Sequence, residues 1–256
     1  NLTLRTSLTS LLLAAIAIGS SAKENQVVSP DGHLAVSIED RDGHLYYKVS
    51  YDGRQMLKPS QLGVVANIGD FSQQLTFKSA ATSTVAKDYT MRTTKTSQSA
   101  YRANQLSVVY ENANKMPITV KFNVSDNNIA FRYEFGNVPE HTHIIIDDEK
   151  TSFSLPDNTT TFLSPQSDPM IGWKRSKPSY EEEYTPDAPM TAKSKYGQGY
   201  TFPCLFHVGN DGWVLVSETG THGNYPGCRL TDYDAQRGYS IAFPMPGECD
   251  GRGASN

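Results

Sequence analysis

A short acidic run stands out in the last third of this 256-residue chain. Glu181, Glu182 and Glu183 follow one another between Tyr180 and Tyr184. Carboxylates are common ligands of hard cations, and calcium takes about six to eight oxygens. In an extended segment Glu181 and Glu183 share a face, so the run supplies one or two carboxylates and the other ligands must come from elsewhere. Because many acidic runs are only solvated surface, a calcium site and plain surface charge are both open interpretations.

Aromatic rings near this run suggest a second kind of chemistry, because the C–H face of a sugar stacks on a flat ring. Trp173, Tyr180 and Tyr184 surround the glutamates, and His222 lies further on beside a glycine and an asparagine. Half or more of such rings pack in the cores or along the edges of β-sandwiches, so their density indicates a nearby site without identifying each contact. Trp173, Tyr180, Tyr184 and His222 are the candidate sugar-binding residues.

Other reactive groups form weaker patterns. Asp147, Asp148 and Glu149 follow an apolar run and are expected in a loop after a strand, although paired carboxylates are what glycoside hydrolysis requires. His207 and Glu218 are the nearest histidine and carboxylate for a mutarotase-like epimerase. The metal-binding HExxH motif, the nucleophile pattern GxSxG and a phosphate-binding glycine loop are absent from the sequence.

The elements that must position these residues are predicted to be strands. Apolar residues alternate with polar ones, and the Asp42-Gly43 and Asp52-Gly53 pairs predict type I′ hairpin turns. No sustained helical periodicity occurs in the chain after its N-terminal apolar run. The pattern therefore predicts an all-β fold, a large antiparallel β-sandwich of two packed sheets. The expected strands are 34–38, 45–51, 106–110, 118–124, 129–135, 153–155, 160–163, 202–208 and 213–217.

The ends of the chain predict export and a domain of a larger protein. Residues 1–22 contain a positive charge, an apolar core and a small-residue cleavage region, which is typical of a signal peptide. No cysteine is near that region, so we expect no lipid membrane anchor. We assign residues 23–248 to the β-sandwich and expect 249–256 to be a truncated tail, because the chain starts without methionine and stops in a polar run.

Charge and cysteine usage narrow the function classes. The net charge of −4 and the lack of a basic stripe give no reason to expect nucleic-acid binding. Export permits disulfides, and Cys204 with Cys228 is the pair to examine, although buried thiols are the more ordinary expectation for an odd count of three.

An ordered set of short segments gives this chain a family resemblance. It resembles the N-terminal domain of glycoside hydrolase family 97 over nearly all of the sequence after the signal peptide. The segments occur in the family's order, and Glu218 retains an acidic position that family members often carry after the last hairpin. The matching segments are 29–32, 46–53, 60–63, 130–133, 180–184, 202–218 and 225–227.

The resemblance implies a sandwich like that of galactose mutarotase, followed by a catalytic (β/α)₈ barrel that this chain lacks. It implies a calcium-dependent, exo-acting α-glucosidase or α-galactosidase that acts on oligosaccharides in the periplasm, as in the starch-utilisation enzymes of gut Bacteroides. The family's N-terminal calcium ligand maps onto Glu181, with Glu183 as second choice, and the catalytic carboxylates are expected on the barrel. A non-catalytic carbohydrate-binding β-sandwich is the alternative function.

Overall fold

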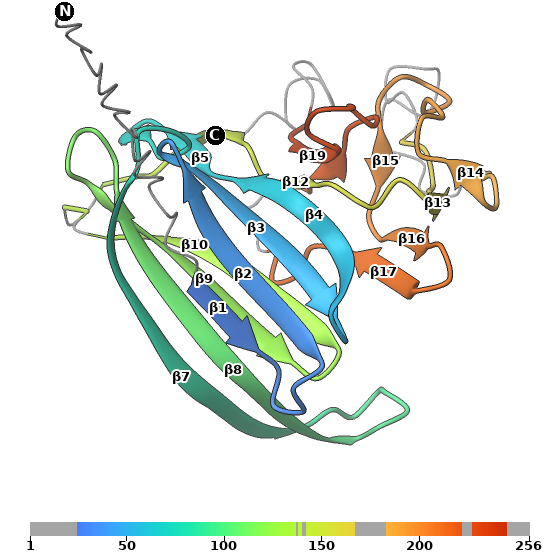
Figure 1. Cartoon of the computed structure of the whole chain (residues 1–256), viewed down its shortest axis with the longest axis horizontal. Helices are drawn as coiled ribbons and strands as arrows, with labels where there is room; N and C mark the ends of the chain where they lie inside the picture. Colours follow the sequence, from blue (N-terminus) through green and yellow to red (C-terminus); the bar gives the residue numbers. More distant parts are fainter. Residues whose placement is uncertain (1–24, 137, 140–141, 167–182, 222–226, 245–256) are drawn as a thin grey trace, which may run out of the picture.

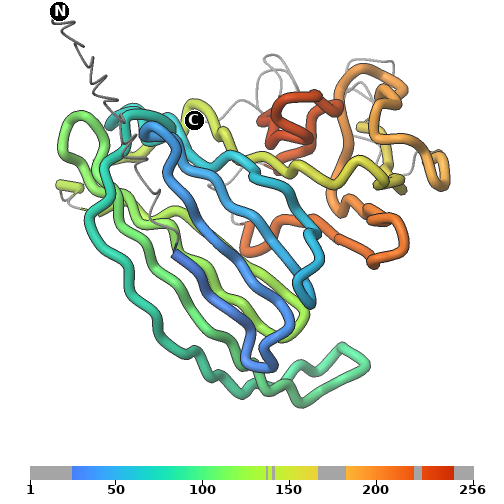
Figure 2. The backbone as a smooth tube through the Cα atoms, in the orientation of Figure 1, coloured from blue at the N-terminus to red at the C-terminus, as the bar shows by residue number. Residues whose placement is uncertain are grey.

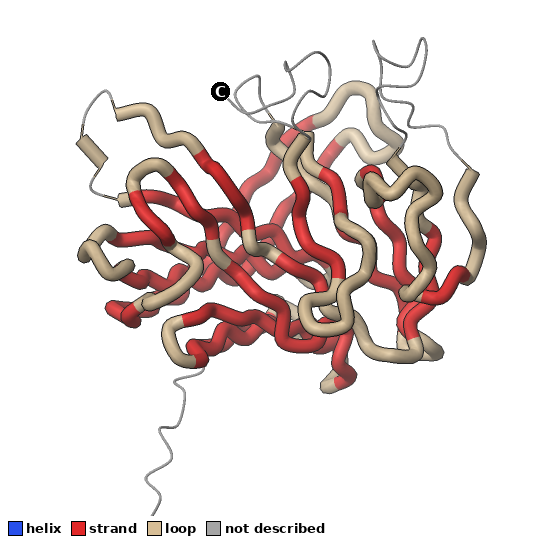
Figure 3. Tube along the Cα trace, turned by 90° about the horizontal axis from the view of Figure 1, so that it is seen from above, coloured by secondary structure: helices blue, strands red, loops and turns tan. Residues whose placement is uncertain are grey.

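The computed structural model describes residues 25–136, 138–139, 142–166, 183–221 and 227–244. Within these ranges the regular structure consists of strands, joined by turns and loops (Figure 3). None of the described residues forms a helix long and apolar enough to cross a membrane. The all-β prediction is therefore confirmed for the described part of the chain.

Two four-stranded antiparallel sheets form a sandwich, as Figure 1 shows. The first has the order β1-β2-β3-β4, and the second has the order β10-β9-β8-β7. The first sheet comprises β1 (Asn25–Val28), β2 (Leu34–Arg41), β3 (His44–Tyr51) and β4 (Arg54–Leu62). The second comprises β7 (Thr76–Thr90), β8 (Gln98–Glu111), β9 (Pro117–Ser125) and β10 (Asn128–Phe135).

The core lies between these sheets because alternate residues of each strand face inward. Val36, Val108, Val120 and Phe122 are fully buried, and Phe122 stacks on Phe131 with ring centroids 5.1 Å apart. The expected inward direction of Phe131, Tyr133 and Phe135 is confirmed, since all three pack against the core.

The two Asp-Gly turns have the predicted backbone conformation. Asp42 and Gly43 have φ values of 53° and 77°, and Asp52 and Gly53 have φ values of 48° and 74°. Type I′ turns require positive φ at both central residues, and this twist matches that of the flanking strands.

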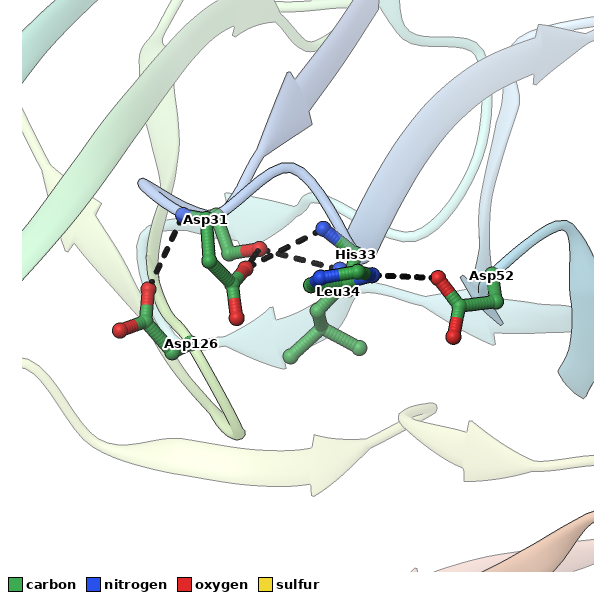
Figure 4. A network of polar contacts seen from close by, with 6 residues as sticks. Asp31, His33, Leu34, Asp52 and Asp126 are labelled. Carbon is green, nitrogen blue, oxygen red and sulfur yellow. Dashed lines mark hydrogen bonds and ion pairs between the residues drawn. The ribbon is translucent and has the colours of Figure 1, made fainter.

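A polar network joins three turns at one end of the sandwich (Figure 4). The Asp31 amide donates to the Asp126 carboxylate at 3.1 Å, and the His33 ring hydrogen-bonds Asp52. The Asp52 carboxylate raises the pKa of the His33 imidazole. The turns that begin β2 and β4 and the turn before β10 are thus held together by charge-assisted contacts.

The remaining strands form three smaller sheets beside the sandwich, with orders β11-β5-β6, β12-β19-β18-β15 and β14-β13-β16-β17. Their buried residues belong to the same hydrophobic cluster as the sandwich core. Tyr47 links the parts directly by donating to the Ser152 carbonyl at 3.0 Å. The strands are β5 (Val64–Ala66), β6 (Gly69–Asp70), β11 (Ile146–Glu149), β12 (Ser152–Phe153), β13 (Thr159–Phe162), β14 (Ala188–Pro189), β15 (Tyr200–Thr201), β16 (Cys204–Val208), β17 (Gly212–Val216), β18 (Arg229–Leu230) and β19 (Tyr239–Ala242).

The prediction that Asp147, Asp148 and Glu149 lie in a loop is wrong. All three belong to β11, which pairs with β5 through an irregular register. The apolar run 144–146 suggested a strand that ends at Ile146, whereas the strand begins at Ile146. Pairing with β5 satisfies the backbone groups of this segment, and such long-range pairing overrides the local composition.

Candidate functional site

The described part of the acidic and aromatic region begins at Glu183. Glu183 and Tyr184 are both exposed, and Tyr184 retains 58% of its accessible surface. Exposure leaves the Glu183 carboxylate and the Tyr184 ring available to a ligand. The other predicted site residues, Trp173, Tyr180, Glu181 and His222, lie outside the described residues, so their predicted roles stay predictions.

The segment after these residues is anchored firmly to the rest of the domain. Ala188–Pro189 forms β14 against β13, and the buried Tyr239 donates to the Met190 carbonyl at 3.1 Å. The Ser194 amide donates to Asp232 at 2.8 Å. Tyr200 is only 6% exposed and donates to the Ala192 carbonyl, so this ring is part of the core and is not a sugar contact.

Gly199 makes a close backbone approach in this segment. Its φ is +84°, and a Cβ built there would lie 2.0 Å from the Leu230 carbonyl oxygen. Its amide donates to Ser194 Oγ at 2.9 Å, and its carbonyl accepts from the Gln166 amide at 2.8 Å. Only glycine combines this conformation with such contact, so Gly199 fixes where β15 meets β18.

Glu183 is the only predicted calcium ligand that lies among the described residues. No group of three or more His, Cys, Asp or Glu side chains suited to a metal occurs among them. Glu183 offers an exposed carboxylate, which has the donor chemistry that calcium prefers. The chemistry of this residue is compatible with one calcium ligand, and a single carboxylate does not complete a calcium shell, so the calcium site stays a prediction.

Glu149, which the sequence placed in a loop, is a partly buried carboxyl at the end of β11. Burial, chiefly, raises the pKa of Glu149, and the charges of Glu218 and Asp148 act in the same direction. The Thr151 hydroxyl bonds the Glu149 carboxyl and opposes this shift. Thr151 Oγ1 is also 2.7 Å from the Tyr133 hydroxyl, which accepts from the Gly63 amide at 2.9 Å. A continuous chain of hydrogen bonds thus ends on Glu149.

Glu218 is the second carboxyl with a raised pKa, and its cause is also partial burial. Both of its oxygens accept from the Cys228 amide, at 3.2 and 3.3 Å. Glu218 therefore joins the chain after β17 to the chain before β18. Its acidic position after the hairpin was noted in the sequence, but its link to Glu149 depends on tertiary placement.

We expect Glu149→Gln to stabilise the domain at neutral pH. The pKa of Glu149 is higher in the folded state than its unfolded value of about 4.3, so folding favours the protonated acid. The stability that this residue contributes is therefore fully present below the unfolded pKa and is lost as the pH rises through the folded-state pKa. Glutamine keeps an acceptor for Thr151 and carries no charge. Thermal unfolding should give the variant a higher Tm than the wild type at pH 7 and an equal Tm at pH 4.

The control for this substitution is Asp148→Asn, whose side chain is 50% exposed and paired with Lys150. It should change the Tm little at either pH, because an exposed ion pair contributes little. A Glu149→Gln variant that is less stable at pH 7 would contradict the assigned cost of burying this carboxyl.

His207 and Glu218 have separate partners. The His207 ring stacks on Trp213 and lies 3.9 Å from the Asp187 carboxylate, whereas Glu218 is engaged by the Cys228 backbone. An epimerase needs a base and a carboxylate that converge on one sugar, and these contacts give that function no support.

Cys204 and Cys228 are both buried and are not joined by a disulfide. The Cys204 thiol donates to the Thr201 carbonyl at 3.2 Å, and burial raises its pKa to about 12. The expectation of buried thiols is confirmed for these two residues. Cys249 lies outside the described residues.

A comparison with known families identifies the family of this domain. The family model described as "Glycosyl-hydrolase 97 N-terminal" matches residues 27–246, which is most of the chain. The chain belongs to the glycosyl-hydrolase 97 N-terminal family. The resemblance read from the ordered sequence segments is thereby confirmed, and so is the large antiparallel sandwich.

Two solved enzymes are similar in structure to this chain over most of its length. A β-arabinopyranosidase matches with a TM-score of 0.83 and 47% identity, over 86% of this chain and 35% of its own. A family 97 enzyme from Pseudoalteromonas sp. strain K8, in complexes with panose and with acarbose, matches with a TM-score of 0.72 and 18% identity, over 88% of this chain and 32% of its own. The chain thus spans about a third of the length of these relatives.

Proposed function

We propose that this chain is the N-terminal domain of an exported glycoside hydrolase that releases terminal pyranosides of galacto configuration from oligosaccharides. The observation that carries the proposal is the 47% identity to a β-arabinopyranosidase. The Pseudoalteromonas enzyme that binds panose and acarbose is only 18% identical, which supports a shared fold and says little about a shared substrate.

Sugar stereochemistry connects this relative with one of the two activities that the family resemblance implied. L-Arabinopyranose has the ring-hydroxyl configuration of D-galactopyranose and lacks its hydroxymethyl group. A β-L-arabinopyranoside and an α-D-galactopyranoside therefore present the same arrangement around the scissile bond. Glucose differs at its C4 hydroxyl. The α-galactosidase alternative thus fits the arabinopyranosidase relative, and the α-glucosidase alternative does not.

The role proposed for this domain is to wall the sugar site and to help hold a calcium ion. Glu181, with Glu183 as second choice, would bind the ion, and Trp173, Tyr180, Tyr184 and His222 would contact the substrate. Calcium, when bound, supplies Lewis-acid stabilisation of charge near the glycosidic oxygen. Export to the periplasm is part of the proposal and is supported by the signal-like residues 1–22.

The substrate proposal is tested with the full-length enzyme and three nitrophenyl glycosides. We expect hydrolysis of β-L-arabinopyranoside and α-D-galactopyranoside, with kcat/KM for α-D-glucopyranoside at least about 100-fold lower. A site built to bond an axial C4 hydroxyl leaves polar groups unpaired when glucose enters. A preference for the glucoside would overturn the proposal.

The 256-residue chain serves as the control in the same assay. It should be inactive, because the carboxylates that cleave the bond are expected on the following barrel. Hydrolysis by this chain alone would contradict the proposed division of roles.

A further inference from the structure

The outward face of the β13–β16–β17 sheet is mostly apolar, with Thr160 and His207 as polar residues, and its β17 side is exposed. Along β16 the side chains of Cys204, Phe206 and Val208 face inward and are fully buried. The alternate residues face the other way, and the cross-strand pairs His207↔Trp213 and Leu205↔Leu215 place them in two rows. Phe162 of β13 pairs with Leu205 and so extends the row that contains Leu205 and Leu215.

The side chains at the edge of this face are large and open. Trp213 retains 53% of its accessible surface and Leu215 retains 63%, the largest value among the exposed large hydrophobic residues of the described chain. The Trp213 ring is held in place by two neighbouring rings. Its centroid lies 4.1 Å from that of His207, on which it stacks, and 5.3 Å from that of Phe162. A rigid, contiguous apolar surface of this kind marks an interaction site.

Strand β7, at another edge of the molecule (Figure 2), offers a comparison. Its side chains are exposed along almost its whole length. Its central residues, Thr82, Ser83 and Thr84, are small and polar. Natural sheets protect solvent-facing edges with such residues, so Trp213 and Leu215 of β17 point to an edge that is covered in the whole enzyme.

We infer that this face, defined by Phe162, Leu205, His207, Trp213 and Leu215, docks against the polypeptide that follows this N-terminal domain in the whole enzyme. Most of the 47% identical arabinopyranosidase lies outside the part that this chain matches. In that relative, a large further part of the same polypeptide is therefore available as the partner. The leucines offer no hydrogen bonds to a sugar, but they suit the apolar centre of an interface between domains. The inference depends on the family placement and not on the identity of the sugar.

The experiment compares Leu215→Cys with Tyr89→Cys in the full-length enzyme, with maleimide labelling as the readout. In this domain Leu215 is 63% exposed and Tyr89 on β7 is 38% exposed, so an open face would be labelled faster at 215. If the face is docked, the cysteine at position 215 is labelled more slowly than the cysteine at position 89. We expect labelling at 215 to be at least about tenfold slower than at 89, because the reagent must wait for local opening.

Three outcomes would overturn the inference. Labelling at 215 that is as fast as at 89 would show an open face. Slow labelling that becomes fast on dilution would show a second copy of the enzyme as the occupant. Protection that requires added galactose or arabinose would show a sugar site. As an independent measurement, Leu215→Asp should lower the Tm of the full-length enzyme more than Tyr89→Asp does, and equal shifts would also count against docking.

Discussion

Gly199→Ala is expected to destabilise the domain by roughly 3 kcal/mol or more, one of the larger effects available to a single methyl group. Two costs add at this position. Alanine at a φ of +84° is strained by about 1–2 kcal/mol, and its Cβ would lie 2.0 Å from the Leu230 carbonyl oxygen. The clash is with backbone, so β15 and β18 must separate. Denaturant unfolding of the wild type and variant measures the difference.

Gly197→Ala is the matched control for this prediction. Gly197 has a similar φ of +70°, but a Cβ there meets nothing within 4 Å. Its substitution should therefore cost only the conformational strain, about 1 kcal/mol. If the two alanine variants lost equal stability, the close approach at Gly199 would not be the reason that glycine is required there.

Glu181→Gln is expected to weaken calcium binding by the full-length enzyme at least about tenfold, provided that Glu181 is the ligand this domain contributes. A glutamine keeps one oxygen and loses the negative charge, and the charge count of the ligands sets calcium affinity. Isothermal titration with calcium measures this without reference to catalysis. We also expect the activity to fall in parallel when calcium is limiting.

Glu182→Gln and Glu183→Gln complete the design for the metal. The sequence predicts an extended segment in which Glu182 faces away from Glu181 and Glu183, so its substitution should leave calcium affinity unchanged. A loss confined to Glu183→Gln would assign the role to the second candidate instead. Unchanged affinity in all three variants would remove the acidic run from the metal site.

Much of the scaffold could be predicted from local patterns. The strands from Leu34 to Phe135 with alternating apolar residues occur where expected, and both Asp-Gly turns have positive φ. The prediction fell short along β7 and the first half of β8, where Ser, Thr and Ala replace the alternating pattern and almost no side chain is buried. A strand held mainly by backbone pairing with its neighbour has no periodic apolar face to reveal it.

The candidate site, like the scaffold, could be predicted from the sequence only in part. The acidic run and its neighbouring rings were visible because their residue types are unusual in combination, and the family resemblance supplied their proposed roles. The charge interaction between Glu149 and Glu218 was not visible, because the two residues are far apart in sequence, one at the end of β11 and the other after β17. Burial of Glu149 in the folded domain is the main cause of its raised pKa, and that burial depends on tertiary packing.

By itself, the sequence determined the all-β class, the hairpin turns and the family, since these depend on spacings of a few residues and on the order of short segments. Tertiary structure alone decided which aromatic rings are core, which carboxyls are buried and which sheet face is left apolar and open. Tyr200 and Trp213 illustrate the difference: one is 6% exposed and the other 53%. Burial is a property of what packs against a side chain, and long-range strand pairing sets that.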